Sequence, residues 1–174
     1  MASMNAFMFF NSGFNSGASI MHKHMQIIPY SSMEGEIPVE QAALHYLKNN
    51  QVQNRMFILP QFKAFKHIFY RIDNDFFEKS SESEEGAEEM SEKLDNYYWQ
   101  CLKKLGNEDH ALDVSYNLLV TKNFLFIALR QIEAVKEDTK TVTVNSLGFA
   151  GTHAVKREED LEIIRKYSPI GILE

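Results

Sequence analysis

The chain has 174 residues, enough for one domain with its own core, and 44% of them are hydrophobic. Its formal net charge of −6 at pH 7 argues against broad binding to nucleic acids or anionic membranes, because a mildly acidic surface attracts neither. The only cysteine is Cys101, which excludes an intrachain disulfide, and no apolar run approaches the ~20 residues that cross a bilayer. We therefore expect a soluble, cytoplasmic protein with a single domain over residues 1–174.

The first part of the chain predicts two strands, a helix and a further strand. Residues 5–11 (NAFMFFN) and 22–30 (HKHMQIIPY) are short apolar segments joined by a loop rich in Asn, Ser and Gly, which favours a strand pair. Residues 38–50 begin with proline and contain helix-forming side chains, so we expect a helix there. Residues 62–72 alternate as a strand would, although not strictly.

The second part predicts helices on either side of a β-hairpin. Residues 79–92 are acidic and rich in serine, which predicts a mobile, solvated loop passing into a helix over about 84–105. Residues 114–130 contain two apolar stretches around 121–123, as a hairpin does. A strand over 141–144 and a helix over 157–167 follow. This order predicts an α+β fold, with a mainly antiparallel sheet and flanking helices.

Two histidines and a glutamine alternate directly after the first loop. In a strand, alternate side chains share a face, so His22, His24 and Gln26 would project together. The loop before them supplies amides, hydroxyls and approachable backbone N–H groups, all of which suit phosphate. These residues are Asn11, Ser12, Gly13, Asn15, Ser16, Gly17 and Ser19. The P-loop pattern G-x-x-x-x-G-K-[ST] is absent from the sequence.

The histidine row is open to three interpretations. The two rings could be ordinary strand histidines that bond to backbone or water. They could bind a metal ion, although residues 1–33 contain neither Asp nor Glu and the cysteine is distant. Alternatively, one imidazole could attack phosphorus and form a covalent phosphoramidate, which needs an oriented ring and hydrogen-bond donors around the phosphate. The adjacent loop provides such donors and favours this third interpretation.

Two segments of the sequence resemble one known family. Residues 11–26 (NSGFNSGASIMHKHMQ) are similar to the active-site segment of the ATP adenylyltransferases, or diadenosine tetraphosphate phosphorylases, the His-x-His-x-Gln branch of the histidine-triad (HIT) superfamily. Residues 116–130 and 144–156 resemble the C-terminal part of the same enzymes. The resemblance implies a HIT-like fold. It also implies that this chain is an incomplete, C-terminal copy, since family members carry further strands and lysines upstream.

The resemblance implies nucleotidyl transfer in two steps. His24 would attack the α-phosphorus of a dinucleoside polyphosphate and release ATP, and inorganic phosphate would then take the adenylyl group to give ADP. His22 would orient the site, and Gln26 would bond to the transferring phosphate. A glutamine amide donates hydrogen bonds but is no base at neutral pH, which favours transfer to phosphate over hydrolysis. No tightly bound cofactor or metal site is implied, although a divalent metal could accompany the nucleotide.

The same comparison assigns nucleotide or phosphate contacts in both segments. The positions are Asn11, Gly17, Ala18, Ser19, Ile20, Asn145, Ser146, Leu147, Thr152 and Lys156. Ile20 and Met21 stand where relatives usually carry Gln and Pro, and Thr152 replaces a more apolar side chain. These departures leave the substrate preference open. His67 and His153 receive no role, because a structural histidine explains each.

Three alternatives to the adenylyltransferase remain. Two are sister enzymes, a nucleoside-diphosphate-hexose phosphorylase and a hexose-1-phosphate uridylyltransferase. The third is a nucleotide-binding protein without turnover. In every case the expected partners are nucleotides (ATP, ADP or a dinucleoside polyphosphate), with inorganic phosphate for the enzyme, and neither nucleic acid nor membrane. An antiparallel sheet that lacks strands exposes an unpaired edge, so we also expect a homo-oligomer or another partner if the chain functions by itself.

Overall fold

The computed structural model describes residues 5–20, 22–33, 36–73, 75–79, 83–106, 114–137, 140–153, 155, 157–168 and 171–173. In chain order the strands and α-helices are β1 (Ala6–Ser12), β2 (Met25–Pro29), α1 (Pro38–Asn49), β3 (Met56–Phe57), β4 (His67–Arg71), α2 (Phe76–Lys79), α3 (Glu84–Lys104), β5 (Tyr116–Val120), β6 (Phe124–Leu129), β7 (Ala134–Glu137), β8 (Lys140–Thr143), α4 (Ser146–Ala150) and α5 (Glu158–Tyr167). Short 3-10 helices cover Phe14–Ser16, Tyr30–Ser32 and Gly171–Leu173. The predicted α+β class is confirmed.

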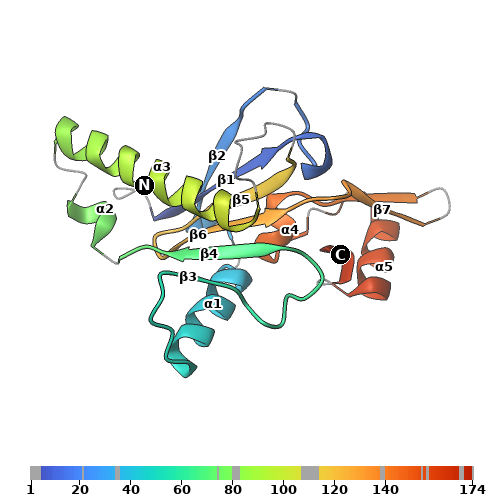
Figure 1. Ribbon diagram of the computed structural model, residues 1–174. Coiled ribbons are helices and arrows are strands. Elements are labelled where there is room, and N and C mark those ends of the chain that lie inside the picture. Colours follow the sequence, from blue (N-terminus) through green and yellow to red (C-terminus); the bar gives the residue numbers. More distant parts are fainter. Residues whose placement is uncertain are drawn as a thin grey trace.

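A six-stranded antiparallel sheet forms the centre of the described structure, in the order β2-β1-β5-β6-β4-β3. β1 pairs with β2 on one side and with β5 on the other, so Phe10 lies opposite both Met25 and Leu118. β7 and β8 form a separate two-stranded ribbon, which projects beside α5 (Figure 1). β2, which follows the histidines, is therefore an edge strand of the main sheet.

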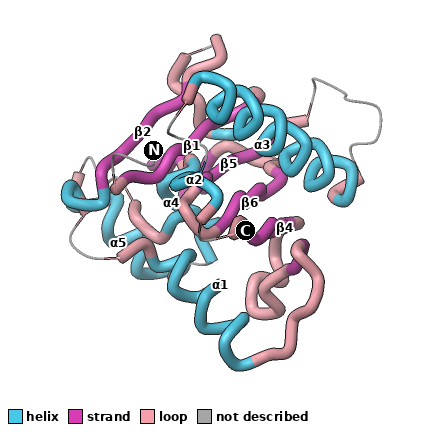
Figure 2. The backbone as a smooth tube through the Cα atoms, turned by 90° about the vertical axis from the view of Figure 1, so that its left-hand side faces the viewer, coloured by secondary structure: helices cyan, strands magenta, loops and turns pink. Residues whose placement is uncertain are grey.

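The sheet has two covered faces, each with its own core. On the face we call the α4 face, Phe7 and Phe9 of β1 pack in one cluster with residues of α1, α4 and α5, such as Phe149. On the opposite α3 face, Phe10 packs in a second cluster with α2 and α3, which contributes Leu102. Figure 2 shows the strands lying between α3 and α1. Consecutive β1 residues thus serve different cores, as strand geometry requires.

Most of the regular elements lie where the sequence predicted them. The helices expected over 38–50, 84–105 and 157–167 are confirmed as α1, α3 and α5, and the hairpin over 114–130 is confirmed as β5 and β6. The two-residue β3 and the five-residue α4 were not expected. Among the described residues, no helix has the length and apolar character needed to cross a membrane.

The mobile loop predicted over 79–92 is wrong for residues 84–92, which form the start of α3. The Ser83 side chain caps the helix by accepting a hydrogen bond from the Gly86 backbone N–H at 3.0 Å. Glu84 and Glu85 occupy the first turn, where negative charge interacts favourably with the helix dipole. An acidic, serine-rich segment can therefore begin a helix when a cap is in place. Residues 80–82 lie outside the described part.

Candidate active site

The loop after β1 is held tightly against two other segments. Gly13 and Gly17 have φ values of 80° and 72°, a region that favours glycine. A Cβ atom on Gly13 would lie 2.5 Å from Ser115 Oγ, and one on Gly17 would lie 2.5 Å from the Val144 carbonyl oxygen. The Asn15 backbone N–H also donates to Ser115 Oγ at 3.0 Å. Glycine is thus required at both positions by backbone conformation and by close packing.

Asn11 joins the two segments that the sequence singled out. Its Oδ1 atom accepts hydrogen bonds from the Ser146 backbone N–H at 2.9 Å and from Asn117 Nδ2 at 2.8 Å, and Ser146 Oγ lies 2.7 Å away. Asn145, the preceding residue, caps α4 through its side chain, which accepts from the Leu147 N–H at 2.9 Å. The structure therefore brings Asn11, Asn145 and Ser146 together, and their side-chain oxygens hold the loops in place.

Two residues that the sequence analysis did not select lie beneath this junction. Asn117 is fully buried, and besides bonding to Asn11 its Nδ2 donates to the Ser16 carbonyl at 2.8 Å. Arg130 is 8% exposed, and its Nη1 donates to Asn117 Oδ1 at 3.1 Å and to the Val144 carbonyl at 3.0 Å. One guanidinium thus bonds both to Asn117, which holds the Ser16 carbonyl of the loop, and to the Val144 carbonyl, against which Gly17 packs. Asn117 is a polar residue within an apolar strand, and Arg130 directly follows another apolar strand. Polar residues at such positions are a sequence signal that could have pointed to both.

The remaining hydrogen bonds of Arg130 fix the chain that enters the β7–β8 ribbon. Its Nη2 donates to the Ile132 carbonyl at 2.6 Å and to the Glu133 carbonyl at 3.2 Å. Burial lowers the pKa of Arg130 to about 10, which still leaves the guanidinium charged at neutral pH. The Arg130 charge also lies 5.2 Å from the centre of the Phe149 ring in α4, a cation–π contact. Its surroundings are carbonyls and a ring that suit a buried cation.

The two histidines lie at the end of this loop and are exposed. Their ring centres are 6.0 Å apart, with the planes at 80° to one another. The strand predicted from residue 22 is wrong at its start, because β2 begins at Met25 and both histidines precede it. The β1–β2 ladder ends at the pair Phe10 and Met25, whereas β1 continues beside β5 to Ser12.

Gln26 is exposed in β2 and lies opposite Phe9 in the ladder. Phe9 belongs to the α4 face, and Asn11, two residues further along β1, has the same orientation. The predicted glutamine and the Asn11 junction therefore lie on one face of the sheet.

The other predicted contact residues vary in accessibility. Gly17 and Ala18 are half-buried, whereas Ser19 and Ile20 are exposed and could reach a ligand. Thr152 is half-buried, and its hydroxyl donates to the Leu147 carbonyl at 3.3 Å. Lys156 lies outside the described residues. Across the part of the chain that the structure describes, no three His, Cys, Asp or Glu side chains gather where they could hold a metal ion.

His67 belongs to the core. It is 5% exposed, its Nε2 accepts from the Leu59 N–H at 2.9 Å, and its Nδ1 lies 3.1 Å from the Phe65 carbonyl. Burial lowers its pKa, so the ring is neutral. The expectation of a structural histidine is confirmed. Cys101 is likewise buried, and burial raises the pKa of its thiol to about 12, which keeps it unreactive.

Comparison with known proteins decides the family. Residues 62–174 match the family model of the ATP adenylyltransferase C-terminal domain. The chain belongs to the ATP adenylyltransferase family. Residues 1–45, which include the glycine loop and both histidines, match the model of the Ap4A phosphorylase N-terminal domain. The resemblance seen in the sequence is thereby confirmed. No curated protein matches the chain.

Solved structures of yeast Ap4A phosphorylase Apa2 share the fold of this family member. The complex with AMP is 21% identical in sequence, with a TM-score of 0.64, and the alignment covers 97% of this chain and 55% of that one. The complex with Ap4A is 22% identical, with a TM-score of 0.60, and the alignment covers 97% of this chain and 53% of that one. This chain therefore spans about half the length of these structures.

Proposed function

We propose that this adenylyltransferase family member transfers adenylyl groups between dinucleoside polyphosphates and phosphate. In one direction it converts diadenosine tetraphosphate and inorganic phosphate to ATP and ADP, and the reverse reaction also runs. The family match and the fold shared with yeast Ap4A phosphorylase support this proposal. We place the reaction in the cytoplasm, since the one cysteine of the sequence is a buried free thiol, as a reducing compartment favours.

The observation that carries the proposal is the junction at Asn11. Through Ser146 and Asn117 it connects the glycine loop to the start of α4, although Asn11 and Ser146 are 135 residues apart. This arrangement fixes the glycine loop against the Asn145–Leu147 turn, and the chain continues from that loop into the exposed histidine pair. Fixed N–H donors around a phosphate, with an imidazole to attack it, are what transfer from a phosphoanhydride requires.

The chemistry assigned to this site has two balanced steps. A His24 ring nitrogen forms a bond to the α-phosphorus of diadenosine tetraphosphate while the bond from that phosphorus to the bridging oxygen breaks, and ATP leaves. A phosphate oxygen then attacks the same phosphorus and displaces the imidazole, which gives ADP and restores His24. His22, whose ring lies beside that of His24, orients the nucleophile. The Gln26 amide donates to a phosphate oxygen and, having no basic atom, activates no water.

The test is covalent labelling of this chain. Diadenosine tetraphosphate carrying 32P at the α position is mixed with the protein, with and without magnesium, and the denatured protein is counted. We expect label on the wild type and on His45→Ala, an exposed histidine on α1, and none on His24→Ala. Addition of phosphate should release the label as ADP. Equal labelling of all three proteins would remove His24 from the mechanism.

Product analysis separates the related functions. If labelled protein forms only from UDP-hexoses, a uridylyltransferase or a hexose-type phosphorylase is the correct assignment. If AMP and Ap4A bind in calorimetry but no label forms under any condition, the chain is a binding protein that depends on further residues for turnover. Diadenosine tetraphosphate as the preferred donor supports the adenylyltransferase.

A further inference from the structure

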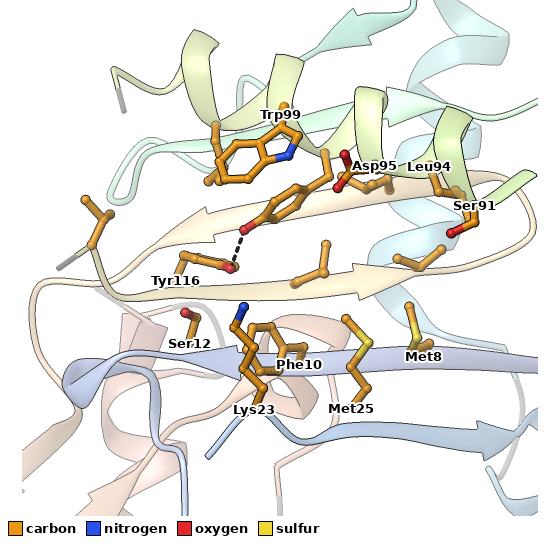
Figure 3. Close-up of a pocket in the computed structure, with 16 residues that line it drawn as sticks. Met8, Phe10, Ser12, Lys23, Met25, Ser91, Leu94, Asp95, Trp99 and Tyr116 are labelled. Carbon is orange, nitrogen blue, oxygen red and sulfur yellow. Dashed lines mark hydrogen bonds between the residues drawn. The ribbon is translucent and has the colours of Figure 1, made fainter. Parts of the chain in front are cut away.

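A cavity of about 730 Å³ lies between α3 and the strands β1, β2 and β5 (Figure 3). Its volume is within the range of small-molecule sites, which are mostly apolar and have a few polar groups. Apolar side chains from the helix and from four strands, β6 included, line it, among them Met8, Phe10, Met25, Leu94, Trp99 and Leu118. Met25 is 58% exposed, so the cavity opens to solvent along the edge strand.

This cavity is separate from the candidate active site. It lies on the α3 face of the sheet, whereas Asn11 and Gln26 lie on the α4 face. Met25 and Gln26 are neighbours in β2 and therefore point to opposite sides. Lys23, which lies between the two histidines in sequence, also lines the cavity. The two sites share a segment of backbone, and Ser12, one of the small residues of the loop, also lines the cavity.

Two kinds of hydrogen-bond donor meet at one end of the cavity. The hydroxyl groups of Tyr98 and Tyr116 lie 2.6 Å apart and bond to each other. Two hydroxyls carry two hydrogens and this contact uses one, so the other can be donated to a ligand. Figure 3 shows Lys23, in the segment before β2, extending toward Tyr116. An ammonium group beside a hydroxyl donor suits a ligand group that is negatively charged and only accepts hydrogen bonds.

Among the described residues that line the cavity, the acidic one, Asp95, is on the helix. Asp95 lines the cavity from α3, where it is exposed, and Figure 3 places it beside Leu94 and across from Lys23. Burial raises the pKa of Tyr98, and the charge of Asp95 adds to this effect, so Asp95 acts on this end of the cavity too. It disfavours an anion on the helix side of the hydroxyl pair and favours placing a ligand's charge on the Lys23 side. The apolar remainder of the cavity offers space for a hydrocarbon body but no further positive charge.

We propose that this cavity binds an organic carboxylate with an apolar body, such as a medium-chain fatty acid. The carboxylate lies between Lys23 Nζ and the Tyr98–Tyr116 hydroxyl pair, and the hydrocarbon chain lies against Trp99, Leu118 and Met8. The proposal does not depend on the nucleotide chemistry, because it concerns the other face of the sheet.

The experiment uses the only tryptophan of the chain, Trp99, which lies in the cavity wall. Its fluorescence is followed while decanoate, at concentrations below micelle formation, is added to the wild type, to Lys23→Met and to Lys63→Met. Lys63 is exposed and does not line the cavity, so its replacement is the matched control. Decanol, which has the same length and no charge, is titrated in parallel.

We expect saturable binding of decanoate to the wild type and to Lys63→Met, with about tenfold weaker binding to Lys23→Met, the loss typical of one charge-assisted hydrogen bond. Decanol should bind Lys23→Met and the wild type equally. The proposal is overturned if decanoate gives no saturable change, if Lys23→Met binds it as tightly as the wild type, or if both lysine variants lose the same affinity. Because Lys23 is exposed, its replacement leaves the fold intact.

Discussion

The buried polar network, formed by Asn117 and Arg130, and the histidine pair, His22 and His24, have opposite surroundings. Asn117 and Arg130 are almost completely buried and bond to carbonyls and amides that belong to the protein. His22 and His24 are exposed. The difference indicates separate tasks: the network fixes the shape of the loop, and the histidines remain accessible to a substrate. Changes in the network should therefore act mainly on stability and changes in the histidines on chemistry.

The largest effect on stability should come from Arg130→Met. This change removes every hydrogen bond of the guanidinium and leaves the Val144 and Ile132 carbonyls without that donor. We expect the free energy of unfolding to fall by about 3 kcal/mol or more, because each buried polar group left unpaired costs about 1–3 kcal/mol. Urea denaturation measures it. Arg165→Met, on the exposed side of α5, is the control and should change little. Equal losses in the two variants would mean that the network does not support the fold.

A smaller effect is expected from Gly17→Ala, which tests how tightly the loop is held. Gly106→Ala is matched to it, because both glycines have positive φ values, of 72° and 95°, but no atom of the described residues lies within 4 Å of a Cβ on Gly106. Gly106→Ala should cost about 1 kcal/mol, from conformation alone. Gly17→Ala adds a clash with the Val144 carbonyl and should cost about 1–3 kcal/mol more. Only Gly17→Ala should also weaken AMP binding in calorimetry, whereas similar affinities would separate the loop from the nucleotide site.

His67 extends the comparison to pH. Burial lowers the pKa of His67 in the folded protein below the ordinary value of about 6.5, so the unfolded chain takes up the proton first as pH falls. The stability that this residue contributes is complete above about pH 6.5 and is lost as pH falls from there toward the folded pKa. The free energy of unfolding of the wild type should therefore approach that of His67→Gln on going from pH 7.5 to 5.5. A stability curve for His67→Gln that runs parallel to that of the wild type over this pH range would contradict the assignment.

The smallest change in stability should accompany the largest change in chemistry. His24→Ala alters an exposed side chain, so its free energy of unfolding should stay within about 0.5 kcal/mol of the wild type. If His24 is the nucleophile, covalent labelling should nevertheless disappear. A large loss of stability in His24→Ala would show that the ring is part of the packing, and would weaken the contrast with Arg130.

Local patterns predicted the long elements and the candidate loop, but not the short elements. α1, α3 and α5 contain a proline start, a serine cap or acidic first turns that local sequence reveals. β3 has two residues and α4 has five, too few for a periodic pattern to emerge. The strand start predicted at residue 22 was wrong. Alternation shows which residues share a face, but it does not show where pairing with the neighbouring strand begins.

The sequence by itself determined the family, the α+β class and the small-residue loop followed by two histidines. Each of these depends on residue types at fixed spacing, which a chain displays before it folds. The tertiary structure decided which residues support the loop, since Asn117 and Arg130 meet Asn11 and Val144 only when β1, β5 and the start of α4 come together. It also decided that a cavity lies on the α3 face of the sheet, because its walls come from a helix and four strands that lie in separate parts of the sequence.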